Sequence, residues 1–322
     1  MHILPDKNTL SQLIKKPLSV ENQLLKLSEK GLKYDDLENA KKILLSTNYY
    51  YFTGYLHKFK SLDIEGEEIY KTDLKIEDLY SLIQIDTQLR SILLQAIDYI
   101  ERDLKTKIAY YLAQDDKIHG SVNYLYSEYF ESKIVKSDRY YREKINGIRR
   151  NHRDFIRHYE GEYNKKVQNS TFVKHHSEKY WGCLPIWVAV EIMTIGNIKH
   201  LYTKLLPTAI QNQVASSLGL SIGLMKNYLS CLNDFRNLLA HNVRIYDLKI
   251  SYTPSTNKKD PIDTTNYIFD YVCVLKYLLS DNDFWNCTIL VQLSIVMGGM
   301  PGNVEAGEWG FPQNWYDILA KK

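Results

Sequence analysis

The stretch IEDLYSLIQIDTQLRSILLQAIDYIERDLKTKIAYYLAQ, residues 76–114, decides the fold. Apolar side chains recur in it at three- and four-residue steps, the period of an α-helix that buries one face. No proline or glycine interrupts the stretch, and either residue would break or weaken a helix. It therefore predicts one or two long helices.

The rest of the chain repeats the helical period on a shorter scale. Further amphipathic stretches lie at residues 19–32, 34–48, 184–205, 208–218, 221–247, 268–280 and 282–297. No alternating apolar and polar pattern is long enough to build a sheet, although residues 248–257 fit one short strand or an extended loop. We therefore predict an all-α fold.

The helical stretches are expected to form one unit that spans residues 1–322. Three parts are predicted within it: N-terminal helices at 15–117, a basic helical excursion at 118–178, and a final set of helices at 179–322. The excursion is separated from the others by its charge, which is described below.

The composition is that of a globular protein with a real core. The chain has 322 residues, of which 44% are apolar and 25% charged, so global disorder is excluded. The N-terminus lacks the apolar h-region of a signal peptide, and the longest apolar run, residues 287–300, is too short to span a bilayer. We expect a cytoplasmic protein without a membrane partner.

The chain lacks the spacings of a metal centre or a phosphate-binding loop. His175 and His176 precede Cys183, but no paired-cysteine or H-E-x-x-H spacing accompanies them. The glycines are isolated, so no cofactor is expected. The cysteines are interpreted as reduced thiols of the core; they are Cys183, Cys231, Cys273 and Cys287.

Basic charge is concentrated between residues 133 and 166. This segment holds eleven Lys or Arg and five Asp or Glu, a net charge of +6 in a chain whose total is +3. Aromatic residues lie among the basic ones, as in surfaces that bind single-stranded nucleic acid. The alternative is a solvated helix face. The aromatic residues are Tyr140, Tyr141, Phe155, Tyr159 and Tyr163.

A second stretch, DFRNLLAHNVRIYD at residues 234–247, carries the candidate chemistry. Leu229, Leu232, Leu239 and Val243 follow helical spacing, and Arg236 continues this stripe between two of the leucines. A guanidinium in an apolar seam must pair or line a cavity. On the same helix Asn237 and His241 share a face, with Arg244 next on that side, while Arg236 and His241 lie about 140° apart.

This set of residues suits metal-independent cleavage of RNA. An imidazole can take the proton of the ribose 2′-OH or give one to the departing 5′-oxygen. A guanidinium can hold the negative charge of the phosphorane. Two copies of the helix would supply two histidines and two arginines across a two-fold axis. DNA lacks the 2′-OH, so DNA is not expected as a substrate.

The chain resembles the Abi-like family of bacterial abortive-infection proteins, the AbiD/AbiF group, and its FRNLLAH helix resembles the R-x4-6-H motif of HEPN ribonucleases. The resemblance runs in order through most of the chain. It rests on KKPLSVENQLLKLSEKGL (15–32), NYYYFTGYLHKF (48–59), residues 76–113, FIRHYEGEY (155–163), LPIWVAVEIMTIGNIKHLYTKL (184–205), LNDFRNLLAHNVRIYD (232–247) and WGFPQNW (309–315).

The resemblance implies a HEPN-like helical domain, a role in phage defence, and RNA as substrate or ligand. Carried over by position, Arg236 and His241 are the motif residues, and Asn237 is the polar residue after the arginine. One good motif per chain implies a homodimer. Asp98 or Glu101 would fit the residue that orients the arginine, although for Glu101 a surface ion pair with the nearby Arg102 or Lys105 is at least an equal alternative. A structured small noncoding RNA is a further implied partner.

Three readings of the function follow from these residues. The first is a metal-independent endoribonuclease of abortive infection. The second is a non-catalytic protein that binds a structured RNA, and one half of a toxin–antitoxin pair is a third reading. A second R-x4-H pair, Arg153 and His158, is expected to bind phosphate or to pack. The candidate RNA-binding residues are Tyr140, Tyr141, Arg149, Arg150, Arg153, Arg157, His158 and Arg244.

Overall fold

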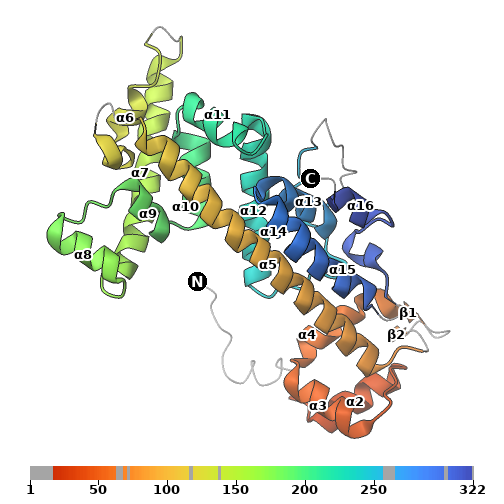
Figure 1. The fold of residues 1–322 in the computed structure, drawn as a ribbon. Coiled ribbons are helices and arrows are strands. Elements are labelled where there is room, and N and C mark those ends of the chain that lie inside the picture. The colour runs from red at the N-terminus through yellow and green to blue at the C-terminus, as the bar shows by residue number, and fades with distance from the viewer. Residues whose placement is uncertain are drawn as a thin grey trace. The chain divides into compact units, whose positions relative to one another are not determined.

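The computed structural model describes residues 17–62, 68–70, 73–115, 119–136, 139–256, 265–300 and 304–320. Helices dominate these residues (Figure 1). The strands among them, β1 (Lys60–Leu62) and β2 (Glu68–Tyr70), form one antiparallel pair in which Ser61 lies opposite Ile69. The predicted all-α fold is confirmed, and residues 248–256, where one strand was an option, contain none.

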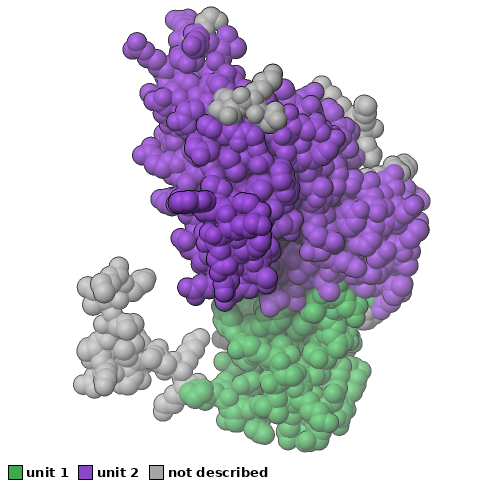
Figure 2. Space-filling model, turned by 60° about the vertical axis from the view of Figure 1, so that its left-hand side comes forward, with its two compact units in different colours: residues 1–88, 300–304 green, residues 89–299, 305–322 purple. Residues whose placement is uncertain are grey.

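The chain divides into two compact units (Figure 2). Unit 1 comprises residues 1–88 and 300–304, and unit 2 comprises residues 89–299 and 305–322. The predicted organisation into 15–117, 118–178 and 179–322 follows other boundaries, and a single folding unit stays a prediction. Unit 1 contains α2 (Val20–Glu29), α3 (Leu37–Ser46), α4 (Tyr49–Gly54), the 3-10 helix η1 (Tyr55–Phe59), β1, β2 and the first part of α5 (Ile76–Ala113).

The helices of unit 1 begin at side chains that cap them. Ser19 accepts a hydrogen bond from the Asn22 backbone, and Asp36 accepts one from Asn39, which satisfies backbone donors that a first turn leaves free. The aromatic stretch 48–59 forms α4 and η1, which bury Phe52 and Tyr55. The Tyr55 hydroxyl donates to the buried Asp86 carboxylate at 2.7 Å, and burial raises the pKa of Tyr55.

Unit 2 is built from the second part of α5 and the helices that follow it. They are the 3-10 helix η2 (Gly120–Leu125), α6 (Ser127–Glu131), α7 (Tyr141–Lys166), α8 (Thr171–Lys179), α9 (Ile186–Ile192), α10 (Ile195–His200), the π-helix η3 (Leu201–Leu205), α11 (Thr208–Ser216), α12 (Ile222–Ala240), α13 (Ile268–Leu278), α14 (Asn282–Phe284), the π-helix η4 (Trp285–Ile289), α15 (Leu290–Gly298), the 3-10 helix η5 (Ala306–Trp309) and α16 (Trp315–Ala320).

The stretch 76–114 forms one continuous helix, α5, of 38 residues. In unit 2 it runs beside α14 (Figure 1), where Tyr99 stacks on Phe284 with ring centroids 4.8 Å apart. The Tyr99 hydroxyl also donates to Asp281 at 3.1 Å. A buried stripe faces the other helices of the unit and contains Leu89, Leu93, Ile97, Ile100, Leu104, Ile108 and Leu112.

The C-terminal helix α16 is tied to the core of unit 2 by two buried donors. The Lys276 ammonium of α13 donates to the Ile318 carbonyl at 2.6 Å, and the Trp285 indole donates to the Leu319 carbonyl at 3.1 Å. Both side chains are almost fully buried, so these bonds form away from competing water. The last helix is therefore part of the packed unit.

Cysteine placement corrects one prediction. Cys231 and Cys273 are buried thiols, as expected, but Cys183 and Cys287 are exposed. Cys183 lies in the loop between α8 and α9, next to the buried Leu184, and Cys287 lies on the exposed side of η4, whose Trp285 and Ile289 are buried. Burial raises the pKa of the Cys231 thiol to about 12, so this thiol stays protonated and unreactive at neutral pH.

Candidate functional site

Helix α12 carries the R-N-x-x-x-H residues at its C-terminal end. Ser221 caps its first turn by accepting from the Leu224 backbone. The buried face includes Leu229, Leu232, Phe235 and Leu239. The prediction that Arg236 continues the apolar seam is therefore wrong. Between Leu232 and Leu239, helical spacing fits a buried residue at position 235 (three residues, then four) as well as at position 236 (four, then three). The ring of Phe235, 5.0 Å from that of Tyr271, takes the buried position.

Arg236, Asn237 and His241 lie together at the exposed end of α12. All three side chains are exposed. The Arg236 Nη1 lies 3.5 Å from the Asn237 Oδ1, to which it donates, and the His241 backbone N–H donates to the Asn237 carbonyl at 3.1 Å. His241 thus continues the last helical turn, and its side chain follows that of Asn237 on one face.

The chain leaves the helix direction directly after His241. Asn242 has a φ of 54°, the left-handed conformation that commonly ends a helix. The Val243 side chain is 40% exposed, so the prediction that it extends the buried stripe is wrong. The Val243 carbonyl accepts a hydrogen bond from Nη1 of the buried Arg90 at 3.4 Å. Arg244 lies beyond the helix end, which corrects its expected place on the Asn237–His241 face.

The segment after the helix end is anchored to the C-terminal part of unit 2. Tyr246 is buried against Trp309, with ring centroids 5.3 Å apart. The Asp247 backbone N–H donates to the Glu308 carbonyl at 3.0 Å. These contacts hold the turn after His241 in place, and so they indirectly fix the end of α12.

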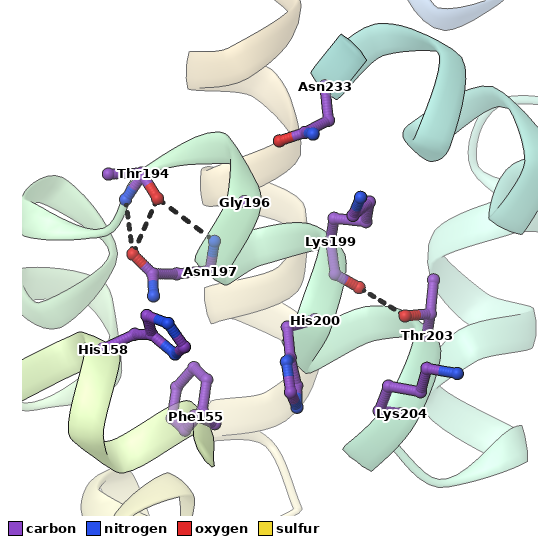
Figure 3. A pocket seen from close by; sticks show the side chains of 10 residues that line it. All are labelled: Phe155, His158, Thr194, Gly196, Asn197, Lys199, His200, Thr203, Lys204 and Asn233. Carbon is purple, nitrogen blue, oxygen red and sulfur yellow. Dashed lines mark hydrogen bonds between the residues drawn. The ribbon is translucent and has the colours of Figure 1, made fainter. Parts of the chain in front are cut away.

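A cavity of about 330 Å³ lies beside the exposed face of α12 (Figure 3). Its walls come from α7, α10, η3 and α12. Of the residues that line it, only His158 was predicted as a site residue from the sequence. The lining residues are Phe155, His158, Thr194, Gly196, Asn197, Lys199, His200, Thr203, Lys204 and Asn233.

The predicted RNA-binding arginines of α7 have different surroundings. Arg150 and Arg153 are exposed, and Arg157, also on this face, lies 3.8 Å from Asp154. Arg149 instead forms a bidentate pair with Glu131, with both nitrogen–oxygen distances at 2.9 Å. Hydrogen bonds from Arg149 hold the pKa of the Glu131 carboxyl below its usual range. Of these four arginines, only Arg150, Arg153 and Arg157 share an open face, at steps of three and four residues.

Most of the aromatic rings of this segment do not form a stacking surface. Phe155 and Tyr159 are buried, because they face α10 and η2 in the core of unit 2. The Tyr159 and Tyr124 hydroxyls are 3.0 Å apart, and that of Tyr124 donates to the Leu184 carbonyl at 2.8 Å. Tyr140 is exposed under the Arg139 guanidinium, 5.8 Å from its ring, and Tyr141 is half-buried.

Three histidines of this region donate to backbone carbonyls, the acceptors that ring N–H groups require. Nδ1 of the exposed His158 pairs with the Asp154 carbonyl at 2.6 Å. Nε2 of His152 pairs with the Tyr124 carbonyl at 3.1 Å, and Nε2 of His200 pairs with the Asn151 carbonyl at 3.0 Å. Burial lowers the pKa of His152 and of His200.

Asp98 and Glu101 form ion pairs within α5. Asp98 lies 3.0 Å from Arg102, and Glu101 lies 3.0 Å from Lys105. An ion pair was the alternative expected for Glu101, and the i, i+4 spacing accounts for both pairs. Neither carboxylate hydrogen bonds to Arg236 in the described part of the chain, so an orienting role stays a prediction.

Residues that could ligate a metal do not gather within the described ranges: no group of three or more His, Cys, Asp or Glu side chains is placed to hold an ion there. None of the helices in those ranges combines the length and apolar character needed to cross a membrane.

The sequence model of one protein family, described as Abi-like protein, matches residues 42–247. The match begins in α3 and ends just after the R-N-x-x-x-H residues. No curated protein is significantly similar to the chain. No solved structure matches it either.

Proposed function

Because the chain belongs to the family of Abi-like proteins, we propose that it is a metal-independent endoribonuclease that acts in phage defence. Membership of this family supports a role in abortive infection. The ribonuclease chemistry is proposed for Arg236, Asn237 and His241.

The observation that carries the proposal is the joint exposure of these three side chains on the last turn of α12. The guanidinium of Arg236 donates to the amide of Asn237, and His241 follows one turn after Asn237, while the buried face of the same helix is apolar. Surface arginines and histidines are common, but this set matches the requirements of one reaction and lies within the family-matched region.

The reaction proceeds by attack of the ribose 2′-oxygen on the adjacent phosphorus. One imidazole accepts the 2′-OH proton while the new oxygen–phosphorus bond forms. The bond from phosphorus to the 5′-oxygen then breaks, and a protonated imidazole gives its proton to that oxygen. Arg236 holds the negative charge of the phosphorane through its forked donors. The products are a 2′,3′-cyclic phosphate and a 5′-OH.

Two proton-transfer groups are needed, and α12 supplies one histidine. We therefore propose that two copies of the chain meet at the exposed end of α12, so that His241 of each copy takes one role. Exposed Val243 and the small Ala240, which lie at this end, allow a close approach of two helices.

A second candidate is a protein that binds a structured RNA without cutting it. The exposed arginines of α7, Arg150, Arg153 and Arg157, favour it, because a row of guanidinium groups suits a phosphate backbone. A small noncoding RNA that restrains the enzyme, as in a toxin–antitoxin pair, would unite the two candidates. The α7 face would then hold the regulator and the end of α12 would cut the target.

The deciding experiment is RNA cleavage in the presence of EDTA. Wild-type protein, freed of co-purified RNA, is expected to cut single-stranded RNA and to leave 2′,3′-cyclic phosphate ends. The His241→Ala variant should be at least a hundredfold slower, since general acid–base catalysis contributes about 10²–10⁴ in rate. The matched control is His175→Ala, which removes an exposed histidine of α8.

Equal cleavage by the wild type and by His241→Ala would contradict the site assignment. Absence of cleavage by the wild type, with one RNA species bound stoichiometrically, would favour the second candidate.

A further inference from the structure

The cavity beside α12, to which this helix contributes Asn233, has the chemistry of an anion site. Its lining includes two lysines and two histidines but neither Asp nor Glu. Lys199 and Lys204 form no ion pair with any residue in the described ranges. The Lys204 side chain is exposed. Paired surface lysines are common; two lysines that share one cavity without an acidic neighbour in its lining are suited to hold a phosphate group.

Asn197 adds a hydrogen-bond donor that the fold itself does not use. Its side chain is buried, with 6% of its surface exposed. The Oδ1 accepts from the Thr194 backbone N–H at 2.9 Å and from the Thr194 hydroxyl at 2.8 Å. The Nδ2 makes no hydrogen bond to a described residue, and Figure 3 shows it directed toward His158. Because Asn197 lines the cavity, this nitrogen is available there to donate to an acceptor of a ligand.

The cavity and the R-N-x-x-x-H residues are parts of one surface. Asn233 lines the cavity and lies one helical turn before Asn237 on the same face, with Arg236 three residues on. Gly196 of α10 lies beside Asn233, because a Cβ at this position would be in van der Waals contact with the Asn233 Oδ1. At a rise of about 1.5 Å per residue, His241 is about 12 Å further along the helix, a distance that a short RNA strand spans.

We propose that this cavity binds a nucleotide of the RNA strand next to the phosphate that is cleaved. Lys199 and Lys204 hold its phosphate, and the Asn197 amide donates to an acceptor of the base, beside the exposed ring of His158. The inference rests on the proposed RNA substrate of the α12 site, and it adds a subsite that positions the strand on that site.

The test uses the full chain with His241→Ala, so that the RNA stays intact, and measures binding of a fluorescent single-stranded RNA. Asn197→Asp is the sharpest additional change. It keeps the oxygen that accepts from Thr194, and an acidic residue suits the first turn of a helix, but it replaces the donor by an oxygen. We expect about tenfold weaker binding, because the hydrogen bond to the base is lost and two acceptor atoms then face each other.

Lys204→Gln is the second variant, since its exposed side chain can change without affecting the fold. It should weaken binding and lower the salt slope by about 0.7, the value for one phosphate neutralised on a single strand. The matched control is Lys226→Gln on α12, which removes a lysine outside the cavity and should leave the affinity unchanged. Thermal unfolding of each variant verifies the fold.

Competition with adenosine 5′-monophosphate distinguishes a site for a nucleotide within an RNA strand from a site for a free nucleotide. We expect it to compete with the RNA only at millimolar concentration, and not to bind Asn197→Asp. If the mononucleotide binds at micromolar concentration without displacing the RNA, the cavity is a site for a free nucleotide and the proposal is overturned. Unchanged RNA affinity in Asn197→Asp and Lys204→Gln would overturn it as well.

The two proposals fail in different ways. If the wild type cuts RNA and the cavity variants keep the RNA affinity, the cavity inference is wrong and the ribonuclease stands. If no RNA is cut but the cavity variants bind it tenfold more weakly, the cavity binds RNA and the catalytic proposal is wrong.

Discussion

The backbone N–H of His241 donates to the carbonyl of Asn237 at 3.1 Å, so the histidine occupies the last position that α12 can hold in helical register. One residue later, Asn242 turns the chain away with a positive φ. The imidazole is therefore presented at the rim of the helix, where a second molecule can reach it from several directions.

Asn237→Ala should reduce RNA cleavage less than Arg236→Ala does. The amide accepts from Arg236 over 3.5 Å at an exposed position, so its loss is expected to slow cleavage about tenfold or less, as for one weak hydrogen bond. Loss of the guanidinium should slow it about a hundredfold to a thousandfold. Initial rates on a fluorogenic RNA give both values. An Asn237→Ala rate as low as that of Arg236→Ala would mean that the amide contacts the substrate itself.

Mixing wild-type and His241→Ala chains tests the proposed two-copy site. If each site needs His241 from both copies, the activity should fall with the square of the wild-type fraction after the chains have exchanged. The measurement is the cleavage rate across mixtures of constant total concentration, with His175→Ala as the mixing control. A linear decrease would show that one copy cuts alone.

Phe235→Ala and Arg236→Ala should separate stability from function. Phe235 is fully buried, so its truncation is expected to lower the free energy of unfolding by about 3–5 kcal/mol. Arg236 is exposed, and its removal should change stability by less than about 0.5 kcal/mol. Urea denaturation followed by circular dichroism gives both values. A large loss of stability in Arg236→Ala would mean that Arg236 packs within the apolar stripe of α12, contrary to its exposure.

Charge reversal on α7 should distinguish the open arginines from the paired one. Arg150→Glu with Arg153→Glu should weaken RNA binding and lower its salt slope by about 0.7 for each phosphate that the protein no longer neutralises. Arg149→Ala should instead lower stability slightly and leave RNA affinity near that of the wild type, because Glu131 occupies its guanidinium. Equal affinity in the double variant would identify the α7 face as merely solvated.

Acid should destabilise the fold through buried histidines. The pKa of His152 is lowered by burial, so the folded state binds its proton less readily than the unfolded chain does. Stability is then full above the unfolded value of about 6.5 and is lost as the pH falls from there toward the lowered pKa.

The measurement is the unfolding free energy between about pH 7 and about pH 5.5, above the range in which carboxylates titrate. His152→Gln keeps a donor for the Tyr124 carbonyl and should flatten this dependence, whereas His175→Gln, at an exposed position, should not. An identical pH profile for His152→Gln and the wild type would exclude His152 as the source.

Helix locations could be predicted from the sequence because periodicity and capping are local. The stretch 76–114 became one helix, since nothing in it breaks the hydrogen-bond ladder. Which of two adjacent residues turns inward was a different problem. Phe235 and Arg236 both fit the period of α12, and only the packing of Phe235 on Tyr271 decides between them.

The candidate site was predictable only where it lies on a single helix. Arg236, Asn237 and His241 are close in sequence, so their proximity follows from the helix. Asn197, Lys199 and Asn233 come from two helices, α10 and α12, that contact each other, and nothing local in the sequence signals this contact. For the same reason Arg149 resembled a nucleic-acid contact, although Glu131 of α6 already binds it.

The bonds from Lys276 and Trp285 to the last helix affect how genetic data on this protein should be interpreted. A nonsense mutation at any of codons 286 to 309 leaves the family-matched region and every proposed catalytic residue intact. It nevertheless strips Tyr246 of Trp309 and leaves two buried donors without acceptors. Such an allele would lose phage protection through unfolding, and only a missense allele at Arg236 or His241, with protein levels unchanged, can report on the chemistry.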